Sequence, residues 1–363
     1  MKLNTQILKE VVSKSIQGAG LNNNIPMTTF MGIVVKEGKL EFITTDATNY
    51  FYVVCDAGIK EDFGILVYAE QFAKLISKIT SEFTYLDIKD RYLEVKANGT
   101  YSLELPVDED GEIITKYPDP LENADLGNIS TEITQDVIAD IIGVCKSSLA
   151  TDDNNRKNFP EITNYYIGEK IFATNRNEVA CINDSIVTSG VLLNPQILEL
   201  LHTMNEDVVY YELDEGSAFI SKSGEYIIYS KQPTDVDNYP IDVLNKYIDT
   251  DFKSVCKVDK NDFIALLERI TLFVGKYDDR VVRLYFEKDG IRVSNNDRSS
   301  NELLAYIDSK KYKSYDCSIN ADKLLTQLKA YKSDTVELHY NSDVCIKFVD
   351  DNIIQIIALM MTK

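Results

Sequence analysis

A short segment recurs three times along this chain of 363 residues, and this repeat limits the possible folds more than any other feature. Its copies are residues 75–88 (LISKITSEFTYLDI), 200–213 (LLHTMNEDVVYYEL) and 327–340 (QLKAYKSDTVELHY). Each begins with apolar residues at helical spacing, has an acid at its eighth position and ends in a strand-like run. The acids, Glu82, Asp207 and Asp334, are 125 and 127 residues apart, so the repeating unit has the size of a domain.

Two further elements recur upstream in each unit, in the same order. Apolar residues spaced as on one face of a helix begin at Ile7 (ILKEVV), Val137 (VIADII) and Phe263 (FIALLE). Each run follows a residue whose short side chain can accept from free helical N–H groups: Thr5, Thr134 and Asp259. A strand, a polar turn and a second strand then indicate hairpins that begin at residues 40 (LEFITTDATNYFYVV), 171 (IFATNRNEVACI) and 291 (IRVSNNDRSSNELLAYI).

This order predicts an α+β protein of three repeated domains with antiparallel sheets. We expect the domains at residues 1–122, 123–248 and 249–363. The first boundary falls in residues 116–126, where Pro118 and Pro120 disfavour a regular helix or a central strand, and the second falls in residues 240–251. No secretory or membrane-spanning run is evident, so we expect a cytoplasmic protein without a membrane partner.

The composition argues against catalysis and against a metal or another cofactor. The formal net charge of −20 is typical of a soluble protein that repels nucleic acid overall. The six cysteines form no Cys-x-x-Cys pair and read as buried thiols, and the two histidines belong to different predicted domains. No phosphate-binding loop or hydrolase motif occurs, and residues 108–112 (DEDGE) lack the further ligands of a calcium loop. We therefore expect that this protein is not an enzyme.

The positive charge is concentrated slightly on the predicted helices. These are residues 5–18, 69–80, 134–146, 194–204, 259–277 and 320–332, with formal charges of +1, +1, −1, −1, 0 and +2. They sum to +2, which leaves −22 on the rest of the chain. If the helices shared one surface, that surface would attract a phosphate backbone. A preference of helices for lysine explains the same counts equally well.

Together with the repeat, several local matches resemble one family, the bacterial sliding clamp, which is the beta subunit of DNA polymerase III. Residues 173–180 (ATNRNEVA) stand where the family has ATDGHRLA, and residues 229–240 (YSKQPTDVDNYP) are similar to its Ser-Lys…Phe-Pro-Asp-Tyr stretch. Residues 282–284 (VRL) with 290–293 (GIRV) resemble the hairpin of its third domain, and Met360-Met361 is similar to its terminal Met-Pro-Met-Arg. The resemblance covers essentially the whole chain and is compatible with a divergent or phage-encoded member of the family.

This resemblance implies a DNA polymerase processivity factor. Two three-domain protomers would join head to tail into a homodimeric ring, with helices lining a central hole and antiparallel sheets outside. Duplex DNA would pass through the hole without sequence preference, and a clamp loader and a DNA polymerase would be the protein partners. The alternative is an acidic adaptor that binds only proteins and does not encircle DNA.

The resemblance also assigns site residues. An apolar groove for partner peptides would involve Phe159, Thr174, Val179, Pro240, Leu359 and Met360. Some of these can equally be core residues, and the chain departs from the family where Arg176, Asn177 and Glu178 replace Gly-His-Arg and Met360 replaces Pro.

The dimer contact and the DNA-facing cations are assigned in the same way. The ring contact would pair Tyr101 and Leu103 with the helix end that holds Leu272 and Phe273, although both segments could instead pack within their own domains. The cations expected to face DNA are Lys9, Lys14, Lys74, Lys78, Lys146, Arg269, Lys323, Lys329 and Lys332. Each lysine taken alone reads rather as a solvated helix residue, so the prediction concerns the whole set.

Overall fold

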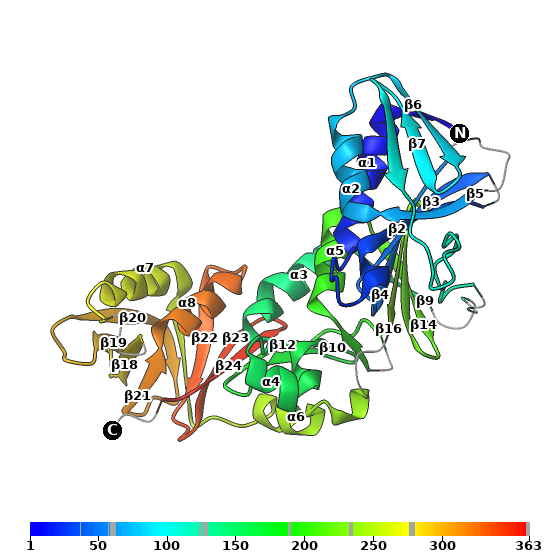
Figure 1. Cartoon of the computed structure of the whole chain (residues 1–363). Coiled ribbons are helices and arrows are strands. Elements are labelled where there is room, and N and C mark those ends of the chain that lie inside the picture. Colours follow the sequence, from blue (N-terminus) through cyan, green and yellow to red (C-terminus); the bar gives the residue numbers. More distant parts are fainter. Residues whose placement is uncertain are drawn as a thin grey trace. The chain divides into compact units, whose positions relative to one another are not determined.

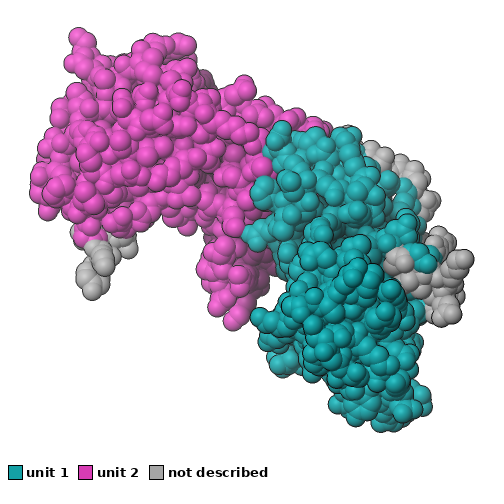
Figure 2. Space-filling model, turned by 90° about the horizontal axis from the view of Figure 1, so that it is seen from above, with its two compact units in different colours: residues 1–138, 196–233 teal, residues 139–195, 234–363 magenta. Residues whose placement is uncertain are grey.

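The structure, a computed structural model, describes residues 1–36, 38–56, 58, 63–122, 124, 126, 130–187, 190–231, 235–275 and 280–360. It comprises two compact units (Figure 2). Unit 1 contains residues 1–138 and 196–233, and unit 2 contains residues 139–195 and 234–363. The second predicted domain contributes residues to both units. The α+β class and the antiparallel sheets predicted from the sequence are confirmed, since every strand pairing in the described residues is antiparallel.

Unit 1 is built on two sheets, which Figure 1 shows in blue, cyan and green. A four-stranded sheet has the order β1-β6-β7-β8, and an eight-stranded sheet has the order β5-β2-β3-β4-β16-β15-β14-β9. The elements are β1 (Lys2–Asn4), α1 (Thr5–Ser15), β2 (Phe30–Lys36), β3 (Lys39–Thr45), β4 (Asn49–Asp56), β5 (Phe63–Tyr68), α2 (Ala69–Lys78), β6 (Phe83–Lys89), β7 (Tyr92–Lys96), β8 (Thr100–Glu104), β9 (Ser130–Ile133), α5 (Pro195–Met204), β14 (Val208–Leu213), β15 (Gly216–Ser221) and β16 (Tyr226–Lys231).

Unit 2 is built on one sheet of twelve strands. Its order is β13-β10-β11-β12-β24-β23-β22-β17-β20-β19-β18-β21. Helix α3 (Gln135–Cys145) begins in unit 1 and ends in unit 2. The other elements are α4 (Asp153–Asn158), β10 (Tyr165–Ile167), β11 (Ile171–Thr174), β12 (Glu178–Ile182), β13 (Val191–Leu193), α6 (Ile241–Ile248), β17 (Ser254–Asp259), α7 (Lys260–Thr271), β18 (Val281–Phe286), β19 (Gly290–Asn295), β20 (Asn301–Lys310), β21 (Tyr315–Asn320), α8 (Ala321–Ala330), β22 (Thr335–Tyr340), β23 (Cys345–Asp350) and β24 (Ile353–Ala358).

All six predicted helices are present, as α1, α2, α3, α5, α7 and α8. The helix predicted over residues 259–277 was too long, because α7 ends at Thr271, and residues 276 and 277 lie outside the described ones. Lys332 lies beyond the end of α8 at Ala330, and not on a helix as predicted. The prediction missed α4, which is short and polar, and α6, which follows Pro240 in a stretch that was interpreted as a domain boundary.

The repeated acidic position has a structural role in all three repeats. It accepts the backbone N–H of the first residue of the upstream helix. The acceptor is the carbonyl oxygen of Glu82 for α1, at 3.0 Å, and that of Asp334 for α7, at 2.8 Å. In the second repeat the side chain replaces the backbone, because Asp207 Oδ1 accepts from the first residue of α3 at 3.0 Å. Each acceptor satisfies one of the N–H groups that a helix start leaves unpaired.

The predicted cap at Thr5 was wrong. Asn4 precedes α1 and its Oδ1 accepts from two backbone N–H groups of the first turn, at 2.9 and 3.2 Å. Thr5 is already helical, and its hydroxyl is 2.9 Å from that of Thr84. Asp259 caps α7 as predicted, since its Oδ1 accepts from Asp262 N at 2.8 Å. Thr134 Oγ1 lies 3.4 Å from the N–H of a first-turn residue of α3.

One face of each of the first two hairpin sheets is apolar and is covered by the chain that leads to the next repeat. In unit 1, Tyr117 packs on this face beside Ile43 and Tyr52, and its hydroxyl donates to Phe30 O at 2.5 Å. In unit 2, Tyr239 packs on the corresponding face formed by β10 to β13, and its ring stacks on that of Tyr166 with 5.2 Å between centroids. These connecting segments therefore contribute to the core.

Candidate functional site

The turn between β11 and β12 is held by a dense set of hydrogen bonds. Thr174 Oγ1 donates to Glu178 O at 2.8 Å and accepts from Arg176 N at 3.1 Å. Asn175 Oδ1 accepts from the backbone N–H of Asn177 and of Glu178, at 3.1 and 2.9 Å. Arg176 has a φ of +75°, a left-handed conformation in which a glycine would be unstrained. The turn is thus rigid, and it presents Arg176.

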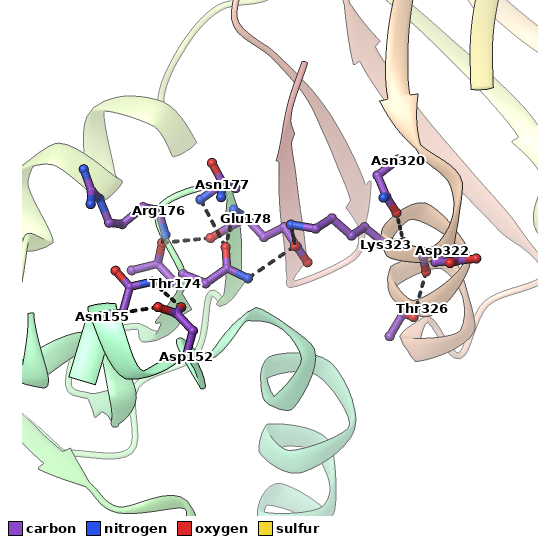
Figure 3. A network of polar contacts seen from close by, with 11 residues as sticks. Asp152, Asn155, Thr174, Arg176, Asn177, Glu178, Asn320, Asp322, Lys323 and Thr326 are labelled. Atoms are coloured by element: carbon purple, nitrogen blue, oxygen red, sulfur yellow. Dashed lines mark hydrogen bonds and ion pairs between the residues drawn. The ribbon is translucent and has the colours of Figure 1, made fainter. Parts of the chain in front are cut away.

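An ion pair with a buried carboxylate lies behind this turn (Figure 3). Glu178 on β12 is only 3 % exposed, and its Oε1 is paired with Lys323 of α8 and accepts from Asn175 Nδ2 at 3.2 Å. Because a buried carboxylate is unfavourable without a partner, this pair ties α8 to β12. Lys332 forms an exposed ion pair with Asp140 of α3, at 2.5 Å.

The six predicted groove residues lie around one apolar cluster of unit 2. Val179 belongs to the cluster and Phe159 packs against it. Thr174 is the register partner of Val179, and Pro240 follows the cluster residue Tyr239. Val179 also pairs with Ile356 of β24, and the two remaining residues, Leu359 and Met360, follow the end of that strand. Met361 lies outside the described residues.

Arg176 adds a charge to this apolar surface. Its guanidinium lies over the ring of Phe159, 4.5 Å from the centroid, and the residue is exposed. The backbone of the turn also contacts the strand that leads to Leu359, since Ala358 N donates to Asn177 O at 2.8 Å. The sequence placed Arg176 at a departure from the family, but the cation–π contact with Phe159 could not be predicted because the sixteen intervening residues form the helical turn Pro160–Thr163, β10 and β11.

Most of the predicted DNA-facing cations are paired with carboxylates of the same chain. The pairs are Lys14–Glu10 (3.1 Å), Lys74–Glu70 (2.7 Å), Arg269–Glu302 (3.0 Å for Nε to Oε2), Lys323–Glu178, Lys329–Glu268 (2.7 Å) and Lys332–Asp140 (2.5 Å). Lys9 and Lys78 lie on α1 and α2, and Lys146 lies on the short helical turn Lys146–Ser148. Apart from Lys323–Glu178, whose carboxylate is buried, these pairs are exposed, and exposed pairs are weak and can exchange for other anions.

Lys14 has an additional partner. Its Nζ contacts the hydroxyl of Tyr226 and lies 4.9 Å from the centroid of that ring. Burial lowers the pKa of Lys14, but the hydrogen bonds with Tyr226 and Glu10 outweigh it, and the net shift is upward. Lys14 is therefore charged at neutral pH and is held against β16.

The predicted dimer residues differ in exposure. Leu272 and Phe273, just after α7, are 80 % and 62 % exposed, which is unusual for large apolar side chains. Tyr101 on β8 is 38 % exposed, whereas Leu103 is 7 % exposed and packs inside unit 1. Within the described residues, β8 pairs only with β7, and the Asn301–Ala305 part of β20 pairs only with β19. Two strand edges thus lack a partner.

The described residues contain no group of three or more side chains that could hold a metal ion. His339 is 2.7 Å from Glu337, and burial lowers its pKa against the opposing effect of that carboxylate. Among the same residues, no helix has both the length and the apolarity needed to cross a membrane.

Comparisons with known proteins identify the fold. No family model matches the sequence, and no curated protein matches it in a sequence search. Solved structures do match over the full length. The DNA polymerase sliding clamp from Bacillus subtilis has a TM-score of 0.85 and 17 % identity, with 100 % of this chain and 99 % of that chain covered. The beta subunit from Streptococcus pyogenes DNA polymerase gives 0.83 and 17 %, with 99 % of each chain covered.

The DNA polymerase III beta subunit from Pseudomonas aeruginosa is a third match, with a TM-score of 0.82, 13 % identity and 99 % of each chain covered. The chain therefore has the fold of the bacterial DNA polymerase sliding clamps, as the sequence resemblance indicated. At these identities the likeness establishes the fold, and the function needs a separate argument.

Proposed function

We propose that this protein is a DNA polymerase processivity factor, a cytoplasmic and non-catalytic sliding clamp that works as a head-to-tail homodimeric ring around duplex DNA. Each protomer would contribute three domains, at residues 1–122, 123–248 and 249–363. A clamp loader would place the ring on DNA, and a polymerase would bind the apolar surface around Val179. The full-length likeness to sliding clamps supports this proposal, and one feature of the strand pairing carries it further.

The supporting feature is a strand junction that occurs twice within the chain. In each case the last strand of a repeat joins the sheet of the preceding repeat: β16 pairs with β4, and β24 pairs with β12. Residues of different repeats can be matched by starting at the first strand of each repeat and following the register from each strand to its neighbour. Tyr226 then corresponds to Ile353, and the residues that they pair with, Val53 and Ile182, correspond as well. Both junctions therefore use the same register.

A third junction of this kind would need two strands that do not pair with each other among the described residues of one chain. The last strand of the first repeat is β8, and the strand of the third repeat equivalent to β4 and β12 is β20. Within the described residues each of these two strands has an unpaired edge, and a partner can protect such an edge. If β20 of one copy pairs with β8 of another, and the reverse, two copies close into a ring. The exposed Leu272 and Phe273 would be covered at the same contact.

The internal register predicts which residues meet. Following the pairings of the first repeat, the residue equivalent to Tyr226 is Gly99, just before β8. Following those of the third repeat, the residue equivalent to Val53 is Glu302 on β20. Gly99 of one copy would then lie opposite Glu302 of its partner, and Thr100 opposite Asn301.

DNA binding by such a ring would be weak and topological. The predicted cations on the helices are mostly paired within the chain, so they would attract a passing phosphate backbone without holding it. Protein partners would bind through apolar anchors in the surface formed by Phe159, Thr174, Val179, Pro240, Leu359 and Met360.

Cysteine cross-linking tests the ring and its register together. A chain with Thr100→Cys and Asn301→Cys should form a covalent dimer of about twice 41.2 kDa on mild oxidation. A control with Thr100→Cys and Leu303→Cys, displaced by two residues along β20, should cross-link poorly. Background should be low, because five of the six native cysteines are buried. A strict monomer in light scattering, with no cross-link from either pair, would contradict the ring and favour the adaptor.

Encirclement of DNA is tested with the same variant. Oxidation in the presence of nicked circular DNA should trap closed rings that stay on the DNA through a wash at high salt. Linearising the DNA should release them, because a closed ring slides off an end while an electrostatic complex dissociates in salt regardless of topology. Equal loss from circular and linear DNA would refute encirclement, even if the cross-linked dimer forms.

A further inference from the structure

The sheet face formed by β18, β19 and β20 differs from its counterparts in the first two repeats. The side facing the core carries Leu284, Ile291 and Val293, each fully buried. The opposite side is polar and lines a pocket of about 270 Å³. The lining residues are Tyr285, Glu287, Arg292, Ser294, Arg298 and Asn301. Figure 1 shows these strands in yellow and orange within unit 2.

One guanidinium in this pocket is neutralised and the other is not. Arg292 forms a fork with Glu287, with Nε and Nη2 at 2.8 and 2.9 Å from the two carboxylate oxygens. Arg298 lies over the ring of Tyr285, 5.8 Å from the centroid, and makes no ion pair with a carboxylate in the described part of the chain. The lining therefore has a net charge of +1 on a chain whose net charge is −20.

Two hydroxyl groups in the same pocket lack a hydrogen-bond partner. Ser294 is 2 % exposed, and its Oγ is buried without a partner among the described residues. The hydroxyl of Tyr285 is also buried and unpaired. Buried polar atoms are usually satisfied in folded proteins, so both hydroxyls are available to donate to a ligand or to an ordered water.

Arg298 is presented by a pinned turn. Its φ is +59°, in the left-handed region, and its N–H donates to Asn295 O at 3.2 Å. Asn295 Oδ1 accepts from Ser300 N at 3.1 Å, and Asp297 Oδ1 accepts from Ser299 N at 2.8 Å, so the Asp297 carboxylate bonds its own turn. These hydrogen bonds hold the backbone of the turn at Arg298 in one conformation.

We propose that this pocket binds a small oxyanion, a phosphate or a carboxylate, between the Arg298 guanidinium and the hydroxyls of Tyr285 and Ser294. An oxyanion accepts from all three groups, and a planar guanidinium matches its paired oxygens. The site is independent of the ring, because a monomer presents the same sheet face. The ring contact would use the backbone edge of β20, where Asn301 of the lining would lie opposite Thr100 of the partner.

Calorimetric titration of the full chain with inorganic phosphate, and separately with acetate, tests the site. Saturable binding of at least one anion is expected. Arg298→Ala should weaken it by more than about tenfold and Tyr285→Phe by about threefold to tenfold. The matched control Lys288→Ala removes one positive charge from an exposed residue of the same repeat and should change affinity by less than about twofold.

The two anions separate the possible sources of the ligand. Binding of phosphate without acetate assigns the site to phosphate, the reverse assigns it to carboxylates, and both bind if the pocket accepts oxyanions in general. Arg298→Lys keeps the charge but loses the fork and should bind more weakly than the native chain. No saturable binding of either anion, or an equal loss in Lys288→Ala and Arg298→Ala, would overturn the site. Circular dichroism confirms that each variant is folded.

Discussion

The two ends of the twelve-stranded sheet in unit 2 show how one strand pattern can serve two purposes. At the end formed by β10 to β13, the outer face carries Phe172, Cys181 and Leu192, and the segment with Tyr239 buries it. At the end formed by β18 to β21, the corresponding face carries charged and hydroxyl groups around a pocket. A covered face contributes stability, whereas an uncovered polar face is available for binding.

The largest effect on stability should follow from truncating Tyr239 in the segment that buries the outer face of β10 to β13. Tyr239→Ala deletes a ring that is 4 % exposed and stacked on Tyr166. We expect it to lower the free energy of unfolding by about 3–5 kcal/mol, as for other buried aromatic residues. The matched change at the other end, Tyr285→Ala, should lower it by less than about 1 kcal/mol. Urea unfolding measures both, and equal losses would mean that the two faces are not different.

The next effect should come from the ion pair between β12 and α8. Lys323→Ala leaves the buried Glu178 carboxylate without a cation, and because Lys323 itself is 37 % exposed we expect a loss of about 1–2 kcal/mol in the free energy of unfolding. Adding Glu178→Gln should restore much of the loss, because a neutral amide is less unfavourable in that position. The comparable change at the other end, Arg298→Ala, should stay within about 0.5 kcal/mol. A double variant no more stable than Lys323→Ala would contradict this explanation.

A smaller, pH-dependent effect on stability is expected where Phe252, which follows α6, packs against β22. The ring of His339 packs edge-on against Phe252, with 6.1 Å between centroids, and burial lowers its pKa below the ordinary value of 6.5. The unfolded chain therefore binds the proton more readily, so stability should fall as the pH drops below 6.5 and level off below the folded pKa. His339→Asn should remove this component from thermal unfolding measured between neutral pH and pH 5. An unchanged profile would exclude His339 as its source.

The smallest effect on stability is expected from replacing the repeated acid, and it should differ between Asp207 of the second repeat and Asp334 of the third. Asp207→Asn replaces a carboxylate that accepts from a helix N–H, a bond that lowers its pKa, so we expect the melting temperature to fall by about 1–3 °C at neutral pH. Because the folded pKa is depressed, the difference should vanish as the pH falls through it. Asp334→Asn should have little effect, since there the backbone carbonyl is the acceptor. Equal shifts in the two variants would mean that the side chain has no special role.

Local patterns in the sequence were sufficient for much of the fold. The apolar spacing around Val137 and Phe263 predicted α3 and α7, because a helix buries one face at a fixed period. Prediction failed where local signals compete or are weak. Thr5 and Asn4 are both good caps, and only the backbone conformation at Asn4, with φ −67° and ψ 126°, decided between them. Nothing apolar or periodic marked α4, whose residues are DNNRKN.

The sequence by itself determined the threefold repeat, the α+β class and the resemblance that placed Val179 and its neighbours at a candidate site, because these depend on residue order and spacing. Only the tertiary structure decided which strands join, that Lys323 reaches a buried Glu178, and that Arg298 lies over Tyr285 without a carboxylate partner among the described residues. The reason is physical. Each of those contacts joins segments that are remote in sequence, and local patterns do not predict the distance between them. Burial determines how unfavourable an unpaired charge is, and it arises only once the chain has folded.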